Sequence, residues 1–273
     1  MSALFIFIFG LAVGSFLNVL ILRLGSEHKQ GIGGRSHCPK CGHELTWQDL
    51  VPVLSFVYLG GKCRYCRQNI SWQYPVVELV TGILFIFLTI NFFNSVASYW
   101  SLFGILTLGF EFFIAGCLIV IFVSDLRFFI IPDEIIIAGV IGTLIWRILA
   151  VWNLFGNWQL DIGNLKTLGF YLLSAIAAGA FFFAIVLVTK GKGMGLGDVK
   201  MAFLMGLVLG WPLILPALLL AFISGALFGL GLIIAGRAKM KSEIPFGTFL
   251  AAATFLTIIY GSQITLWYSK FLF

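Results

Sequence analysis

The chain has 273 residues, of which 60% are hydrophobic and only 10% are charged, and its mean hydropathy is +1.06. A soluble domain carries about 25% charged residues because its surface must be hydrated, so this composition excludes an ordinary soluble fold and indicates a chain whose main solvent is lipid. Seventeen Lys and Arg against eleven Asp and Glu give a net charge of +6. In a membrane protein this excess is first a signal of topology, because positive residues collect in cytoplasmic loops, and we predict no nucleic-acid partner.

The first apolar segment, residues 1–22, carries no charge. A helix rises about 1.5 Å per residue, so this length can cross a hydrocarbon core of about 30 Å. A cleaved signal peptide would have basic residues before its apolar stretch, and none is present here. We therefore predict a retained first helix with its N-terminus outside and Arg23 as the first cytoplasmic anchor.

Further apolar segments lie at 74–93, 100–123, 135–152 and 168–188. The run at 199–235 is too long for one ordinary pass, and Gly210, Trp211, Pro212 and Pro216 provide turn residues that divide it into two. A last segment covers 245–268. The sequence therefore predicts an all-α polytopic membrane protein with about eight transmembrane helices.

The positions of the cations test this topology. With the N-terminus outside, three cations, Arg147, Lys166 and Lys270, fall on or near the outer side. The other fourteen fall on the inner side: Arg23, Lys29, Arg35, Lys40, Lys62, Arg64, Arg67, Arg127, Lys190, Lys192, Lys200, Arg237, Lys239 and Lys241. A seven-span model would move the last three outside, so the asymmetry favours eight spans.

The polar stretch at 25–73 contains four of the five cysteines: Cys38, Cys41, Cys63 and Cys66. Two Cys-x2-Cys pairs separated by twenty-one residues are typical of a structural zinc site, and a small segment needs such help to fold. Two disulfides are the alternative, although the predicted topology places this segment in the reducing cytoplasm. We predict three parts: a first transmembrane helix (1–24), a cytoplasmic zinc-binding domain (25–73) and a seven-helix membrane region (74–273).

Four acidic residues lie within or at the edge of apolar segments: Glu78, Glu111, Asp125 and Asp198. Such groups are costly in lipid unless they face a cavity or a partner, so each is a functional candidate. Two predicted spans separate Asp125 from Asp198, which places both at the same, cytoplasmic, membrane face. Two carboxylates brought together there can share a proton and activate water, which is the chemistry of an aspartic protease.

Each aspartate also has a structural interpretation. Asp198 follows glycines at 191, 193, 195 and 197, which let backbone approach an extended substrate, but an Asp beside such a loop can instead cap a helix. Asp125 can instead form an ion pair with Arg127.

These blocks, in their order along nearly the whole chain, resemble the type IV prepilin peptidases, membrane aspartic peptidases with a Gly-x-Gly-Asp motif that are also N-methyltransferases. The resemblance rests on Gly14-Ser15-Phe16-Leu17-Asn18-Val19 with Arg23, the Cys pairs, Asp49 to Ser55, Tyr74 to Glu78, Asp125 to Pro132, Gly195-Leu196-Gly197-Asp198 and Pro245-Phe246-Gly247.

The resemblance implies that Asp125 and Asp198 are the catalytic pair and cut the short basic leader of prepilins and pseudopilins at the cytoplasmic face of the inner membrane. It also implies methylation of the new N-terminal residue from S-adenosylmethionine. Glu78 borders the cysteine-containing segment and is a candidate for the cofactor region, the alternative being an ion pair with a loop Arg. Residue 133 is Asp where some members have Asn, and Thr248 stands where another proline is common; we expect neither to touch the aspartates.

Other interpretations remain open from sequence alone. The protein could be a peptidase that lacks methyl transfer, a proton-coupled membrane transporter or a zinc-stabilised docking protein. Transporters often contain internal repeats and polar groups deep in several spans, whereas no convincing repeat is present and the aspartates lie at one face. We leave Glu111 unassigned, and we interpret Cys117 as a small core residue.

Overall fold

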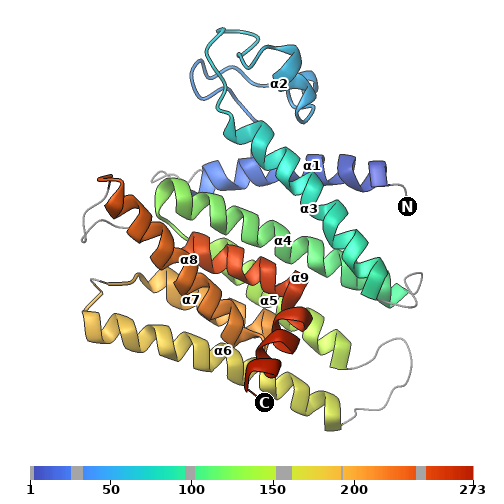
Figure 1. Cartoon of the computed structure of the whole chain (residues 1–273). Coiled ribbons are helices and arrows are strands. Elements are labelled where there is room, and N and C mark those ends of the chain that lie inside the picture. The colour runs from blue at the N-terminus through green and yellow to red at the C-terminus, as the bar shows by residue number, and fades with distance from the viewer. Residues whose placement is uncertain are drawn as a thin grey trace. The chain divides into compact units, whose positions relative to one another are not determined.

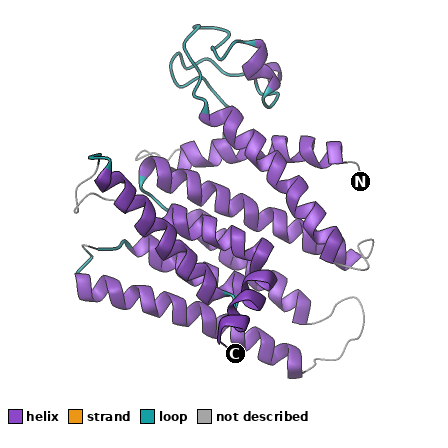
Figure 2. Ribbon diagram, in the orientation of Figure 1, coloured by secondary structure: helices purple, strands orange, loops and turns teal. Residues whose placement is uncertain are grey.

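A computed structural model describes residues 3–25, 33–95, 102–151, 162–191, 193–237 and 244–272. This part of the chain consists of helices and the loops between them, as Figures 1 and 2 show. Two isolated β-bridges, His37 with Glu44 and Lys62 with Asn69, lie in the loops of the cysteine-containing segment. The helices are α1 (Ala3–Gly25), η1 (Trp47–Asp49), α2 (Leu54–Tyr58), α3 (Gln73–Ser95), α4 (Leu102–Phe128), α5 (Asp133–Val151), α6 (Ile162–Thr189), α7 (Leu196–Leu209), α8 (Ile214–Ile234) and α9 (Phe246–Leu272). The predicted all-α class is confirmed.

Each predicted apolar segment corresponds to one of the long helices. The division of the long run at 199–235 is also confirmed, because α7 ends at Leu209 and α8 begins at Ile214. Gly210 between them has a φ of +69°, a backbone conformation that glycine adopts without steric cost. Four of the predicted cytoplasmic cations, Lys29, Lys192, Lys239 and Lys241, lie outside the described residues.

Five of the described helical segments are long and apolar enough to cross a membrane: Ala3–Gly25, Gln73–Phe93, Phe103–Phe128, Lys166–Thr189 and Ile214–Ile234. This supports a polytopic membrane protein. Helix α7 has only 14 residues and spans about 21 Å, less than a typical hydrocarbon core of about 30 Å. The count of eight spans therefore stays a prediction.

The chain divides into two compact units, Met1–Val120 and Ile121–Phe273. In the first unit α1 and α3 pack so closely that only glycine fits at two positions of α1. A Cβ on Gly10 would lie 2.7 Å from Cα of Gly82, and one on Gly14 would lie 2.7 Å from Cα of Glu78. Gly10 and Gly14 form the Gly-x3-Gly pattern that brings membrane helices into close contact. Buried Asn18, one turn further along α1, donates a hydrogen bond to the carbonyl of Tyr74.

In the second unit α7 is the central helix and packs on α5, α6, α8 and α9. Its residues Met201, Ala202 and 204–209 are buried, which fits a helix surrounded by protein. The closest approach is to α6, where a Cβ on Gly206 would lie 2.5 Å from Cα of Ala175. The end of α4, the start of α7 and the start of α9 lie at the same end of this unit (Figure 1).

We expect Gly206→Ala to destabilise the protein, because the new methyl group would contact backbone of α6 that cannot move without separating the two helices. Overpacking of this kind costs about 1–3 kcal/mol. Thermal unfolding in detergent should show a lowered midpoint. Gly231→Ala in α8 is the matched control, since a Cβ there meets nothing within 4 Å, and it should leave the midpoint unchanged or slightly higher. Equal midpoints for the two variants would contradict the close packing.

Candidate functional site

Asp125 lies in the last turn of α4 and is only 5% exposed. Its Oδ2 accepts a hydrogen bond of 2.8 Å from the backbone N–H of Thr248, and the N–H of Gly247 is a further donor. Both donors belong to the first turn of α9, where backbone N–H groups have no partner within the helix. The start of α9 therefore offers the Asp125 carboxylate hydrogen bonds and the positive end of a helix dipole.

Glycine at 247 is what allows this contact. A Cβ at that position would lie 2.9 Å from Oδ2 of Asp125 and 2.7 Å from Cδ1 of Ile131. Ile131 also packs against the first turn of α7, where a Cβ on Gly197 would lie 3.3 Å from the Cβ of Ile131. Ile131 thus contacts the starts of both α7 and α9, and it links the turn that carries Asp198 to the turn that binds Asp125.

Asp198 is in the first turn of α7, and its Oδ2 accepts a hydrogen bond of 3.2 Å from the backbone N–H of Gly195. Asp198 is therefore not the N-cap of α7, a position held by Gly195, but the third residue of the helix, and its carboxylate binds the N–H of the N-cap residue. Asp198 also experiences the charge of Asp125. The structure therefore brings the two predicted aspartates together at one end of the second unit, as counting the spans between them predicted.

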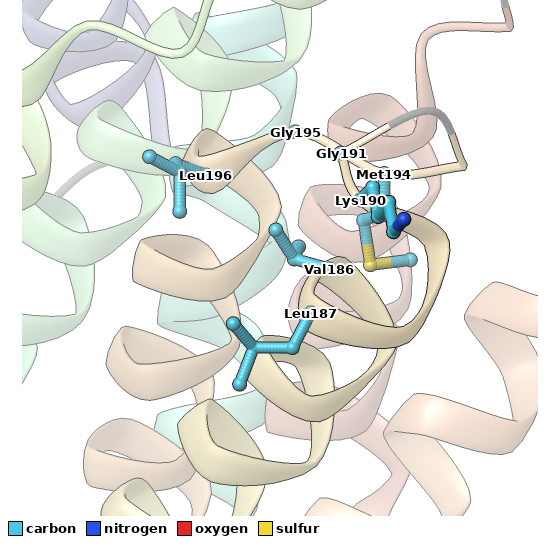
Figure 3. Close-up of a pocket in the computed structure, with 7 residues that line it drawn as sticks. All are labelled: Val186, Leu187, Lys190, Gly191, Met194, Gly195 and Leu196. Atoms are coloured by element: carbon cyan, nitrogen blue, oxygen red, sulfur yellow. The ribbon is translucent and has the colours of Figure 1, made fainter.

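A cavity of about 520 Å³ lies beside this loop, between the end of α6 and the start of α7 (Figure 3). Its lining is mainly apolar, with Lys190 as its cation: Val186, Leu187, Lys190, Gly191, Met194, Gly195 and Leu196. Gly195, which donates to Asp198, also lines the cavity. The cavity therefore adjoins the backbone that binds the Asp198 carboxylate.

The sulfur atoms of Cys38, Cys41, Cys63 and Cys66 all lie within 4.8 Å of one another, and all four are free thiols. The two pairs have the same local geometry. The N–H of Gly42 bonds to the carbonyl of Cys38, and the N–H of Arg67 bonds to that of Cys63, four residues after the first cysteine in each case. A tetrahedral zinc with Zn–S bonds of about 2.3 Å requires sulfurs somewhat under 4 Å apart. The cluster fits that donor set and can hold a metal ion.

The thiolate is the form of cysteine that binds metal, and the cysteines of this cluster differ in how readily they ionise. The backbone of Gln68 favours ionisation of Cys66, but burial and the three neighbouring thiols outweigh it and raise the pKa of Cys66 to about 11. Burial opposes ionisation of Cys38, but backbone N–H groups of Cys41 and Lys40 and the neighbouring thiols outweigh burial and lower the pKa of Cys38 to about 7.

Asp49 joins the two halves of the cysteine-containing segment. It accepts hydrogen bonds from the N–H and hydroxyl of Thr46, from Nε of Arg64 at 2.7 Å and from the hydroxyl of Tyr65. Burial opposes its ionisation, but the bonds from Thr46 and Arg64 outweigh it, so the pKa of Asp49 lies below its ordinary value. Because these bonds occupy both carboxylate oxygens, we assign Asp49 a structural role.

Glu78 is 6% exposed, and its Oε2 accepts a hydrogen bond of 2.8 Å from the N–H of Val53, with Ser15 as a second partner. The carboxylate therefore joins α1, α3 and the loop before α2. That Glu78 lines a cofactor site stays a prediction. Glu111 lies on α4, and we assign it no role. Cys117 also lies on α4 and is buried, which agrees with its interpretation as a small core residue.

Two family models match the chain. One describes the bacterial peptidase A24 N-terminal domain and covers residues 8–92, and the other describes the type IV leader peptidase family and covers residues 112–230. A prepilin leader peptidase/N-methyltransferase of Bacillus subtilis is 34% identical and covers 97% of both chains.

The chain belongs to the type IV leader peptidase family.

Other members of this family are similar along the same length. Proteins with the same printed name from Aeromonas salmonicida and Pseudomonas aeruginosa are each 30% identical, and each alignment covers 96% of this chain and at least 91% of the relative. No solved structure matches the chain. The family relationship therefore rests on sequence, and the resemblance inferred from the ordered motifs is confirmed.

Thr248 is the site residue that sequence reasoning misjudged. We expected it not to touch the aspartates, and this was wrong, because its backbone N–H donates to Asp125. A proline at this position could not make the bond, since proline has no N–H. The Pro245-Phe246-Gly247 motif directly before Thr248 indicated that this region matters. It could not show that the N–H of Thr248 is a donor, because a backbone N–H is present in every residue except proline. Asp133, the other departure from the family pattern, pairs with Lys200 at 2.7 Å.

We expect Cys63→Ser to lower the zinc content of the purified protein and to speed amide exchange across 36–70, because three thiolates hold the ion less tightly than four and the segment has little core of its own. Metal analysis and hydrogen exchange in detergent measure both effects. Cys117→Ala is the control, since this thiol lies outside the cluster, and it should keep the metal and the exchange pattern. Unchanged zinc and exchange in Cys63→Ser would contradict the metal site.

Proposed function

We propose that this protein is a membrane prepilin leader peptidase and N-methyltransferase that uses Asp125 and Asp198 as its catalytic pair. The activity follows from membership of the type IV leader peptidase family and from relatives with this name along nearly the whole chain. The observation that supports the choice of residues is that Ile131 contacts both the start of α9, which binds Asp125, and the start of α7, which carries Asp198, and that Asp198 experiences the charge of Asp125. Its substrates are prepilins and pseudopilins, from which it removes the leader peptide.

Asp125 receives two backbone N–H donors, which stabilise its negative charge, so we assign it as the base. It takes a proton from water as the water oxygen attacks the scissile carbonyl carbon. Asp198 gives its proton to the carbonyl oxygen. When the tetrahedral species collapses, the carbon–nitrogen bond breaks and the leaving amine takes the proton held by Asp125. The proton returns from the hydroxyl to Asp198, which restores the pair.

The glycine loop and the cavity support an extended substrate at this site. Gly193, Gly195 and Gly197 have no side chains, so a peptide can run beside their backbone. The apolar cavity next to Gly195 would accept a side chain near the scissile bond.

S-adenosylmethionine would supply the methyl group. A carbon–nitrogen bond to the new N-terminal amine would form as the methyl carbon–sulfur bond breaks, which would leave S-adenosylhomocysteine and release one proton from the amine. We propose that this reaction involves the first unit and that Glu78 belongs to the cofactor region, because its buried carboxylate joins α1, α3 and the cysteine-containing segment. The four cysteines would hold a structural zinc, which cross-links a segment that has little core of its own.

We further propose the orientation and the domain plan. The N-terminus lies outside, the aspartates and the zinc domain (25–73) lie at the cytoplasmic face of the inner membrane, and the peptidase region covers 74–273. The predicted excess of inner cations supports this orientation. The partners are the bilayer and the prepilin-like substrates.

We expect Asp125→Asn and Asp198→Asn each to lower prepilin cleavage by about 100-fold or more, because each removes one half of the acid–base pair. Cleavage of a prepilin in reconstituted membranes measures this, and thermal unfolding shows that the variants are folded. Asp133→Asn is the matched control: it loses an exposed ion pair worth about 0–1 kcal/mol and should keep its activity. Full activity in either site variant would overturn the assignment.

We expect Glu78→Gln to lower methyl transfer more than cleavage, because it removes a charge from the proposed cofactor region while its amide oxygen can still accept from Val53. Labelled S-adenosylmethionine and cleaved pilin report transfer, and uncleaved prepilin reports proteolysis. Glu44→Gln, which removes an exposed partner of Arg35, should change neither. Equal loss of both activities in Glu78→Gln would assign Glu78 a structural role. If the natural protein transfers no label to pilin, it is a peptidase without methyltransferase activity.

A further inference from the structure

Helix α2 presents an apolar face outward. Leu54, Val57 and Tyr58 are 67%, 68% and 84% exposed. Their spacing of i, i+3 and i+4 places them on one side of the helix. Trp72, which immediately precedes α3, is 72% exposed. A segment fully surrounded by water would bury such side chains, since exposed apolar area costs about 25 cal/mol per Å².

The depth of α2 relative to the membrane follows from its contacts with α3, one of the helices able to cross a membrane. The N–H of Val53, directly before α2, bonds to Glu78, five residues inside α3. Five residues of helix rise about 7–8 Å. The ring of Phe56 in α2 lies 5.0 Å from the ring of Trp72. Helix α2 is therefore held at the level where α3 enters the membrane, not above it.

The surface of α3 at this level is also apolar. Val76, Leu79 and Val80 surround Glu78 in sequence and are exposed. In a span these side chains face lipid, and Trp and Tyr are the residues that favour the boundary between headgroups and acyl chains. Tyr58 on α2 and Trp72 directly before α3 are residues of this kind, and both are exposed.

We propose that α2 is an interfacial helix whose Leu54, Val57 and Tyr58 side chains insert into the bilayer at the boundary between headgroups and acyl chains. The cysteine-containing segment then rests on the membrane through α2, and the occupant of this face is lipid. The inference is independent of the peptidase activity, since it uses only contacts within the first unit.

The backbone before α2 supports a fixed docking depth. Val53 has φ 60° and ψ −48°, and the N–H of Leu54 bonds to the carbonyl of Pro52, which together make a tight turn that a β-branched residue adopts only under strain. The hydrogen bond to Glu78 satisfies the Val53 N–H in this conformation. Glu78 thus acts as the positioning residue that fixes where α2 begins.

The test places a fluorescent probe on the face. Full-length Tyr58→Trp protein is reconstituted into nanodiscs made with lipids brominated near the headgroup end or near the tail end of the acyl chain. The emission added by the new Trp should be blue-shifted and should be lost with the first lipid more than with the second. Gln68→Trp, at an exposed position after the second Cys pair, is the matched control and should add emission that neither lipid quenches.

Three outcomes would overturn the proposal. Added emission from Tyr58→Trp with a water-like maximum and no quenching would place the face in water and leave it for a protein partner. Equal quenching of Gln68→Trp would mean that the whole segment, not α2, meets the lipid. A Val57→Asp change introduced into Tyr58→Trp should weaken the quenching while metal content stays unchanged; undiminished quenching would contradict insertion of this face.

Discussion

A carboxylate at the edge of a bilayer must find its hydrogen-bond donors within the protein, because water is scarce there and an unpartnered charge is costly. In this chain the donors are backbone N–H groups at the starts of helices. Asp125 bonds to the start of α9, and Asp198 closes the start of α7. The bond to Asp125 requires the backbone of α9 to come close, which explains the glycine at 247, and Gly197 makes room for Ile131 beside the start of α7. The rest of the second unit positions these helix starts.

In the first unit a buried carboxylate, that of Glu78, also needs a hydrogen-bond donor from the protein. Glu78 receives the N–H of Val53 and so joins a loop to two membrane helices. Gly10 and Gly14 allow α1 to pack closely on α3, and Gly14 lies directly against the backbone of Glu78. The buried carboxylate is therefore one attachment of the cysteine-containing segment to the membrane helices, and Arg23 of α1, which donates to the carbonyls of Gly33 and Gly34, is another. A zinc ion held by the four cysteines would order the segment itself, while Glu78 orders its attachment.

Much of the fold could be predicted because its signals are local. Apolar segments of sufficient length predicted the helices, and the turn residues around Gly210 correctly divided the run at 199–235. The spacing of Cys38, Cys41, Cys63 and Cys66 predicted their cluster, because two residues between cysteines fit one tight turn. Counting spans between Asp125 and Asp198 predicted that they lie at the same end of the bundle, since each crossing reverses the end at which a helix terminates. Whether the two carboxylates come close could not be predicted in this way.

The sequence by itself determined the membrane class, the helices, the thiol cluster and the family. Only the tertiary structure identified the backbone of Thr248 as the partner of Asp125, Ile131 as the side chain that contacts both helix starts, and Val53 as the partner of Glu78. The physical reason is that a backbone N–H is the same in every residue except proline, so its use by a distant carboxylate depends on how the helices approach each other in space. The apolar residues of 25–73 likewise acquired a meaning only when contacts placed α2 beside the start of α3.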